Sequence, residues 1–142
     1  MMVVDANLLI YAYNSSTSQH DAARGWIEDA FSGHDPVGLA WSSIHAFLRL
    51  TTHPALFPQP LDMSDAVAIV ESWLAQPIVG IVEPGESYQT ILQALLRGAQ
   101  IRGSMVMDAH LAALALENGA VLVTTDRDFR RFEGLTVTNP LA

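Results

Sequence analysis

Apolar residues follow two patterns along the chain. Short continuous apolar runs alternate with longer segments in which apolar positions recur every three or four residues. The first pattern is typical of buried strands, and the second is typical of helices that pack by one face. Strands are predicted at residues 2–4, 36–40, 79–82, 120–124 and 135–138. Helices are predicted from about residue 6 and within residues 18–32, 42–52, 62–76, 86–100, 105–118 and 127–132.

The alternation of strands and helices predicts the fold class. Helical connections between strands favour an α/β fold with a mainly parallel sheet and helices on both faces. We expect residues 1–142 to form a single domain, since this length suffices for a buried core. Serines are expected at three helix starts, and glycines at the break before the last long helix and at its end. These residues are Ser18, Ser42, Ser64, Gly103 and Gly119.

Composition and charge narrow the functional classes. The chain has no cysteine, which excludes disulfides and thiolate metal sites. It has no basic leader before Asp5 and no apolar run of roughly 18 residues, so we expect a cytoplasmic protein. Fifteen acidic residues against seven arginines and no lysine give a formal charge of −8. This charge argues against broad electrostatic capture of nucleic acid, so any such activity needs a local source of positive charge.

Three aspartates occupy informative positions. Asp5 follows the first predicted strand, Asp126 follows the strand at 120–124, and Asp108 lies in the first turn of a predicted helix. Because ligands of open α/β sheets bind beyond the carboxyl ends of the strands, these side chains are expected to meet there if the two strands are neighbours. Clustered carboxylates require a cation or raised pKa values. Oxygen ligands without histidine or cysteine suit Mg²⁺, or Mn²⁺ in its place.

Each aspartate also has a local explanation. Asp108 would be favoured by the dipole at the start of its helix. Asp126 would cap the short helix at 127–132, with Asp128 in its first turn, and Asp5 would cap the helix that begins near residue 6. The coincidence of all of them at strand ends and helix starts favours a shared site.

Three segments resemble a known family. VVDANLLIYAYN at the start, MVMDAHLAALALENGAVLVTTDRDF in the last third and RFEGLTVTNPL near the end are similar to PIN-domain ribonucleases. More narrowly, they resemble VapC-type toxins of type II toxin–antitoxin pairs. The similarity extends over nearly the whole chain, including WSSIHAFLRLTTHPALFPQPL, and its last-third motif is the most specific.

This resemblance implies both a fold and an activity. The fold would be a PIN-like three-layer sandwich, and the activity would be magnesium-dependent endoribonuclease cleavage of RNA. A cognate antitoxin would inhibit the enzyme, and a homodimer is usual among similar proteins. By position in the motifs, Asp5, Asp108 and Asp126 would be catalytic residues and metal ligands, with Asp128 as a fourth catalytic acid.

The sequence departs from the family at one position. Many members carry a glutamate before an apolar-apolar-Arg run, and here Ala46 stands there, in AFLR. No acidic residue between Asp35 and Asp62 replaces it. The departure favours a site with one metal ion over a site with two.

Other residues are candidates for substrate binding or support. Asn7, Arg127 and Arg130 are candidates for binding substrate, with Arg131 in the same cluster and Arg49 and Arg102 as possible neighbours of the site. A solvated helix face is the competing interpretation of this arginine cluster. Thr124 and Thr125 either orient Asp126 or simply suit a strand. Four aromatic residues are expected to lie in the core, not to stack on bases: Trp41, Phe47, Trp73 and Phe132.

Two alternative functions remain. One is a catalytically degenerate PIN-fold binding module, which the alanine at position 46 would favour. The other is a metal-dependent phosphatase, although the usual lysine is absent and Asp5 is followed by Ala6 and Asn7 where an Asp-x-Asp motif would be needed.

Overall fold

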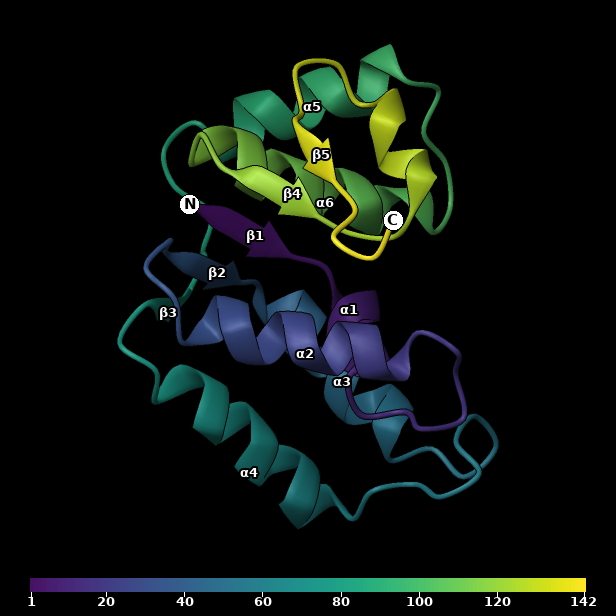
Figure 1. The fold of residues 1–142 in the computed structure, drawn as a ribbon. Coiled ribbons are helices and arrows are strands. Elements are labelled where there is room, and N and C mark those ends of the chain that lie inside the picture. Colours follow the sequence, from purple (N-terminus) through teal and green to yellow (C-terminus); the bar gives the residue numbers. More distant parts are fainter.

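A five-stranded sheet lies at the centre of the chain in a computed structural model that describes residues 1–142 (Figure 1). Its strands are β1 (Met2–Val4), β2 (Val37–Leu39), β3 (Val79–Ile81), β4 (Val121–Val123) and β5 (Val137–Thr138). They lie in the order β3-β2-β1-β4-β5, and every neighbouring pair is parallel. β1 and β4 are therefore direct neighbours although they are far apart in sequence, with Val4 beside Val123.

Helices cover both faces of this sheet. They are α1 (Ala6–Tyr11), α2 (His20–Phe31), α3 (Trp41–Thr51), α4 (Met63–Leu74), α5 (Tyr88–Gly98), α6 (Met105–Glu117) and the 3-10 helix η1 (Arg127–Arg131). Because side chains alternate along a strand, Val4 packs into a core with α1 to α4, and Val3 into a second core with α5, α6 and η1. This arrangement confirms the predicted α/β fold class.

The helix starts differ from the prediction at three serines. α2 begins at His20, one residue after Gln19, so Ser18 lies outside it. α3 and α4 begin before Ser42 and Ser64, and none of these three helix starts has a side-chain capping hydrogen bond. The reason is clear for α3, because only Ala40 separates it from β2 and the chain turns into the helix as soon as the strand ends.

The last long helix, α6, carries an acidic residue to the carboxyl edge of the sheet. Most of α6 is buried, which explains its small apolar side chains. Gly119 follows its end with φ of 60°, a left-handed conformation that glycine adopts without strain, as the sequence predicted. At its start, Asp108 lies in the first turn and Met107 is exposed. No helix has both the length and the apolar character needed to cross a membrane.

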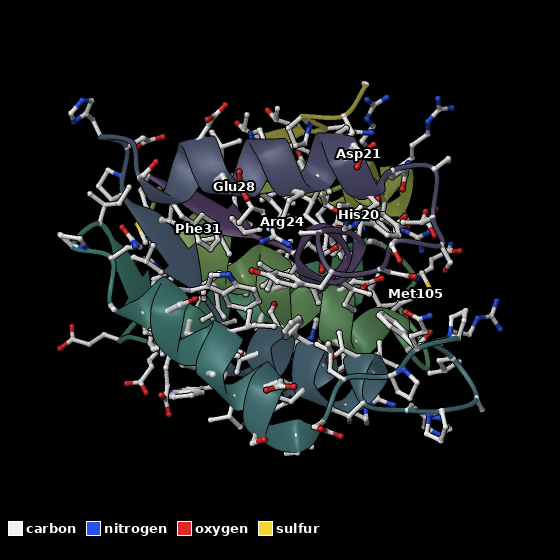
Figure 2. The ribbon with its side chains drawn as sticks, turned by 60° about the horizontal axis from the view of Figure 1, so that its bottom comes forward. His20, Asp21, Arg24, Glu28, Phe31 and Met105 are labelled. Carbon is white, nitrogen blue, oxygen red and sulfur yellow. The ribbon has the colours of Figure 1, made fainter.

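A cleft of about 230 Å³ lies between α2 and α4, on the side of the sheet away from α6. Arg24 and Phe31 of α2 contribute to it (Figure 2), and Trp73 of α4 lines it from the other side. The Arg24 guanidinium lies 4.7 Å from the centre of the Tyr13 ring. The indole N–H of Trp73 is buried and has no hydrogen-bond partner. The floor of this cleft is therefore apolar, and the Trp73 indole N–H is buried below its surface.

Candidate active site

Asp5 lies at the point where β1 ends and α1 begins. Its backbone N–H donates to the Val123 carbonyl at 2.9 Å, so the chain is still paired with β4 at this residue. Its Oδ1 accepts a hydrogen bond from the Ala6 N–H at 2.7 Å, which confirms that Asp5 caps α1. Burial raises the pKa of the Asp5 carboxyl; hydrogen bonds from Thr124 and Ala6 oppose the rise, and the charge of Asp126 adds to it.

Thr124 joins the two strand ends through its hydroxyl. This residue is only 1% exposed, and it donates to Asp5 Oδ2 at 2.7 Å. Its oxygen accepts from the Asp126 N–H at 3.0 Å and from Asn7 Nδ2 at 3.2 Å. Thr124 therefore positions the Asp5 carboxylate and the backbone of Asp126. Its presence here is explained by these hydrogen bonds, and not only by the preference of threonine for strands.

Asn7 links α1 to the end of β4. Its side-chain amide donates to the hydroxyls of Thr124 and Thr125, the second at 2.9 Å. Because the Thr124 hydrogen is already donated to Asp5, the Asn7 group that faces it must be the NH₂. The Oδ1 of Asn7 is then left buried without a hydrogen-bond partner. This unused acceptor lies one helical turn or less from Asp5.

Asp108 approaches the same site from α6. Burial is the largest cause that raises the pKa of its carboxyl, to about 6. The negative charges of Asp126, Asp5 and Asp128 raise it further, in that order, and the Arg131 guanidinium partly offsets them. The structure thus brings the four predicted acids close enough to influence one proton equilibrium.

Asp5 and Asp108 line one cleft of about 560 Å³. We call it the acidic cleft, and its opposite side, the α3 wall, consists of Ser42, Ser43, His45, Ala46 and Arg49. No three carboxylate or imidazole side chains lie close enough together to hold one ion. Ala46 occupies the wall that faces the two aspartates, so the departure noted in the sequence falls within this cleft.

Asp126 and Asp128 lie at the border of the acidic cleft. Asp126 caps η1, since its Oδ1 accepts from the Asp128 N–H at 2.8 Å, as the sequence predicted. Asp126 lines a separate small cavity of about 70 Å³ together with Arg127 and Arg130. These two arginines therefore sit beside Asp126, away from the cleft of Asp5 and Asp108.

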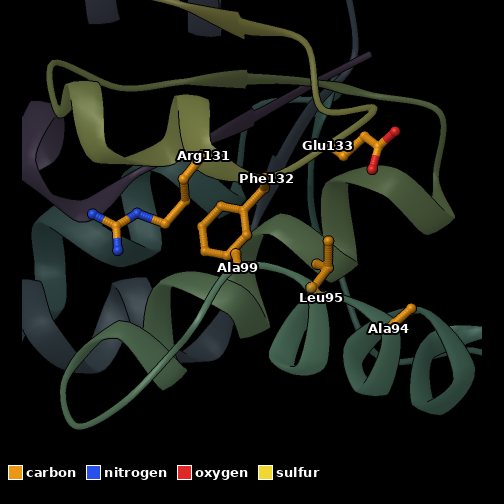
Figure 3. A pocket seen from close by; sticks show the side chains of 7 residues that line it. Ala94, Leu95, Ala99, Arg131, Phe132 and Glu133 are labelled. Atoms are coloured by element: carbon orange, nitrogen blue, oxygen red, sulfur yellow. The ribbon is translucent and has the colours of Figure 1, made fainter.

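Arg131 takes a different direction from its two neighbours. Its Nε donates to the Asp128 carbonyl at 3.0 Å, and its Nη2 lies 3.7 Å from Asp128 Oδ1. Its Nη1 donates to the Met105 sulfur at 3.4 Å, which ties η1 to the start of α6. Arg131 also borders a cavity of about 280 Å³ with Phe132 and Glu133, from which its guanidinium points away (Figure 3).

The sequence patterns did not indicate that Ser42, Ser43 or His45 would line the cleft. Trp41 was expected in the core, and this prediction is wrong because the side chain is 45% exposed. Phe47, Trp73 and Phe132 are buried as predicted. The signal available in the sequence was the spacing of four residues from Trp41 to His45 and on to Arg49, which places all three on one side of a helix.

The family model of the PIN domain matches residues 2–135. The chain belongs to the PIN domain family. This result confirms the resemblance to PIN-domain proteins, and the matched residues include the carboxylates at the edge of the sheet.

Curated relatives of this PIN-domain chain carry VapC names. Ribonuclease VapC37 of Mycobacterium tuberculosis is 43% identical over 142 residues, covering 100% of this chain and 99% of the relative. Ribonuclease VapC33 from the same species is 36% identical over 141 residues, with 99% of each chain covered. The resemblance to VapC-type proteins is therefore confirmed over the full length.

Solved structures agree on the fold. VapBC2 from Rickettsia felis, crystallised with a promoter DNA fragment, superposes with a TM-score of 0.71 at 15% identity and covers 97% of both chains. VapC20 of Mycobacterium tuberculosis, described as a sarcin–ricin loop cleaving toxin, gives a TM-score of 0.65 at 19% identity, covering 92% of this chain and 93% of that one. At such identities the likeness shows the shared fold.

Proposed function

We propose that this PIN-domain protein is a divalent-metal-dependent endoribonuclease and the toxin of a toxin–antitoxin pair. The observation that carries the proposal is the pair Asp5 and Asp108, which share a cleft and both have raised pKa values. Such a pair is costly without a cation and suits one that binds oxygen. The full-length relatives named as ribonucleases support RNA as the substrate.

The donors available fit Mg²⁺ or Mn²⁺. Asp5 and Asp108 would hold the ion, and Asp126, at the border of the cleft, would become a third ligand only if its side chain moved closer to them. Two carboxylates are enough, since Mg²⁺ keeps several waters and shares the remaining positions with substrate phosphates. The unpaired Oδ1 of Asn7 would accept from such a water. When bound, the metal would supply polarisation of the phosphate and a water of lowered pKa.

The protein's own side chains would position the reactants. Thr124 fixes the Asp5 carboxylate through the hydrogen bond to Oδ2. Arg49, on the α3 wall, would neutralise a phosphate that enters the cleft opposite the acids. Arg127 and Arg130, which lie beside Asp126, would contact RNA phosphates outside the acidic cleft. Asp128, the fourth acid, would act mainly by its charge on Asp108.

A cleavage assay tests the proposal directly. Purified protein should cut single-stranded RNA with Mg²⁺ or Mn²⁺ and much less with Ca²⁺, whose larger radius relaxes the geometry that phosphoryl transfer uses. Undiminished cleavage in excess chelator would contradict the metal requirement. Hydrolysis of a phosphomonoester without cleavage of RNA would point to the phosphatase alternative. No hydrolysis by the wild type would favour the binding module.

The partner protein would bind between α2 and α4. The cleft there is lined by Ile27, Phe31 and Trp73, which would pack against apolar side chains of a bound segment. Arg24 and Glu28 at its border form an ion pair with each other at 2.9 Å. Each would also attract a side chain of opposite charge on the bound segment. One structural neighbour is described as a toxin–antitoxin complex from Klebsiella pneumoniae and another as VapBC-1 from nontypeable Haemophilus influenzae, which supports an antitoxin as the partner.

Co-expression with the neighbouring reading frame tests the partner proposal. The product of that frame should suppress toxicity and bind the purified chain, and exchange of charge by Arg24→Glu with Glu28→Arg should weaken binding. Persistent toxicity together with no binding would contradict the antitoxin assignment. We further propose a homodimer, for which exposed Leu56, Met63 and Val67 offer an apolar surface. Light scattering that shows only monomer at micromolar concentration would contradict it.

A further inference from the structure

Trp41 is an exposed tryptophan at the start of α3. Its side chain is 45% exposed, whereas Trp73 is 4% exposed. Its indole N–H donates to Glu83 Oε1 at 3.2 Å, so one edge of the ring is held while much of its surface remains free. Core packing does not explain this position, because nearly half of the indole remains in contact with solvent.

Trp41 belongs to a regular series along α3. His45 follows four residues later and stacks on it, with ring centres 6.2 Å apart and an angle of 30° between the planes. Arg49 follows after four more residues, and all three side chains are exposed. Positions four apart on a helix are about 6 Å apart along its axis, so the series extends for roughly 12 Å. We call Trp41, His45 and Arg49 the α3 stripe.

The α3 stripe leads into the acidic cleft. His45 and Arg49 both line that cleft, opposite Asp5 and Asp108. No carboxylate lies on α3, and Arg49 is its one permanently charged side chain. The stripe therefore presents an aromatic surface followed by a guanidinium, next to the proposed catalytic carboxylates.

We propose that the α3 stripe is a stacking site for unpaired nucleobases of the RNA that enters the acidic cleft. The proposal rests on the proposed function and identifies the form of its substrate. Aromatic side chains stack on any base because every base has a π-face, and a neighbouring arginine binds phosphate or stacks in turn. Bases in a duplex are already stacked on each other, so the site selects a strand that is unpaired at this point.

The charge of the protein supports stacking as the source of affinity. With a formal charge of −8, the surface offers little general attraction for a polyanion. Stacking involves no counterion release, so it contributes at ordinary salt where phosphate contacts weaken. Glu83, which holds the indole edge, opposes phosphates near Trp41 and favours a base at that point of the stripe. The α3 stripe thus resolves how an acidic protein would hold RNA.

The fluorescence anisotropy of an end-labelled RNA measures this binding without cleavage, in the wild type and in variants that lack Trp41. In buffer with excess chelator, an unpaired RNA of about eight nucleotides, a length within the range that single-strand sites occupy, should bind the wild type and quench its tryptophan fluorescence. Trp41→Ala should bind roughly 10- to 100-fold more weakly, in line with alanine substitutions at stacking residues. Trp41→Phe should recover most of the affinity, because phenylalanine still stacks. Trp26→Phe, on α2, is the matched control and should bind like wild type.

Two further ligands isolate the role of the base. An abasic strand of the same length and a fully paired duplex should both bind at least about fivefold more weakly than the unpaired strand, since neither offers a free π-face. Equal binding of the abasic strand, or affinity of Trp41→Ala within about twofold of wild type, would overturn the proposal. A Trp41→Ala variant that no longer binds the partner protein but still binds RNA like the wild type would also overturn it.

Cleavage kinetics separate this proposal from the proposed function. Trp41→Ala should raise KM while kcat at saturating RNA stays near the wild-type value, because the stacked base lies away from the reacting phosphate. Wild-type cleavage with an unchanged KM in Trp41→Ala would refute the α3 stripe and leave the ribonuclease assignment intact. Base-dependent quenching at Trp41 without cleavage under any metal would refute the ribonuclease assignment and leave the α3 stripe intact.

Discussion

The two walls of the acidic cleft differ in charge and in how their side chains are held. On one wall, which we call the acidic wall, Asp5 and Asp108 have raised pKa values because they are buried and lie near other acids. On the other, the α3 wall carries serines, His45, Ala46 and Arg49, and no carboxylate. The first wall is electrostatically unfavourable without a cation, and the second is not. Under the proposed function, the first wall would perform the chemistry and the second would hold the substrate.

The hydrogen bonds of the two walls agree with this division. Asp5 is fixed by the Ala6 N–H and by the Thr124 hydroxyl, both at 2.7 Å, and its proposed role as a metal ligand would need such a fixed orientation. The Arg49 side chain, by contrast, is exposed. Changes on the acidic wall should therefore alter kcat and metal response, and changes on the α3 wall should alter KM.

The largest expected effect is the loss of cleavage in Asp5→Asn. Asparagine keeps the shape and caps α1 as well as aspartate does, but it removes a negative ligand. Because a bound metal contributes several kcal/mol to such reactions, we expect kcat to fall by at least ~100-fold. Single-turnover cleavage of a short RNA measures it, with the exposed Asp29→Asn as the control. Wild-type activity in Asp5→Asn would remove this residue from the site.

The second effect is a gain of stability in Asp108→Asn without metal. The folded-state pKa of about 6 lies above the ordinary 3.8, so folding favours the protonated carboxyl. The contribution of Asp108 to stability is therefore complete below about pH 4 and is lost as pH rises through 6. Water screens part of the repulsion at this partly exposed group, so we expect Tm of the variant to exceed wild type by roughly 2–5 °C at pH 8.

Thermal melts in chelator across pH 4 to pH 8 measure this difference, with Asp29→Asn as the control, and they should show it vanish near pH 4. Added Mg²⁺ should raise Tm of the wild type in proportion to ln(1 + [L]/Kd) and should raise that of the variant little. A Tm difference that does not depend on pH would contradict the electrostatic explanation. Equal magnesium responses would exclude Asp108 as a ligand.

The aspartates of the site were accessible from sequence, whereas of the α3 wall only Ala46 and Arg49 were. Asp5 follows β1 directly and Asp126 comes three residues after the end of β4, and parallel strands place such residues at one edge of the sheet. Their meeting needed only the adjacency of β1 and β4. The exposure of Trp41 depends instead on which elements leave its face uncovered, and a large aromatic residue in sequence predicts burial. The serine caps failed for a related reason, since chain connections decide where α3 begins.

The third effect is a moderate rise of KM in Arg49→Gln. The guanidinium faces the acids across the cleft and would pair with an RNA phosphate. A charge-assisted contact that is partly exposed is worth about 1 kcal/mol, so we expect KM to rise roughly fivefold with kcat nearly unchanged. Steady-state kinetics at several salt concentrations measure it, and the variant should have a shallower salt dependence. Arg97→Gln on α5 is the control, and an equal effect there would mean that only net charge matters.

The smallest effect should come from making the two walls alike with Ala46→Glu. Ala46 lines the cleft opposite Asp5 and Asp108, so a glutamate there would add a third acid to the pair. Without metal, the new charge should lower Tm by only about 1–3 °C, because the position is partly open to water. With Mg²⁺, an additional oxygen ligand should tighten binding by roughly 3- to 10-fold and more than restore the lost stability.

The matched control for any steric effect in the cleft is Ala46→Gln, because glutamine has almost the same size as glutamate without its charge. Titration calorimetry of wild type and both variants decides the matter. If Glu and Gln at position 46 bind Mg²⁺ with equal affinity, the ion lies beyond the reach of α3, and the α3 wall takes no part in holding the metal.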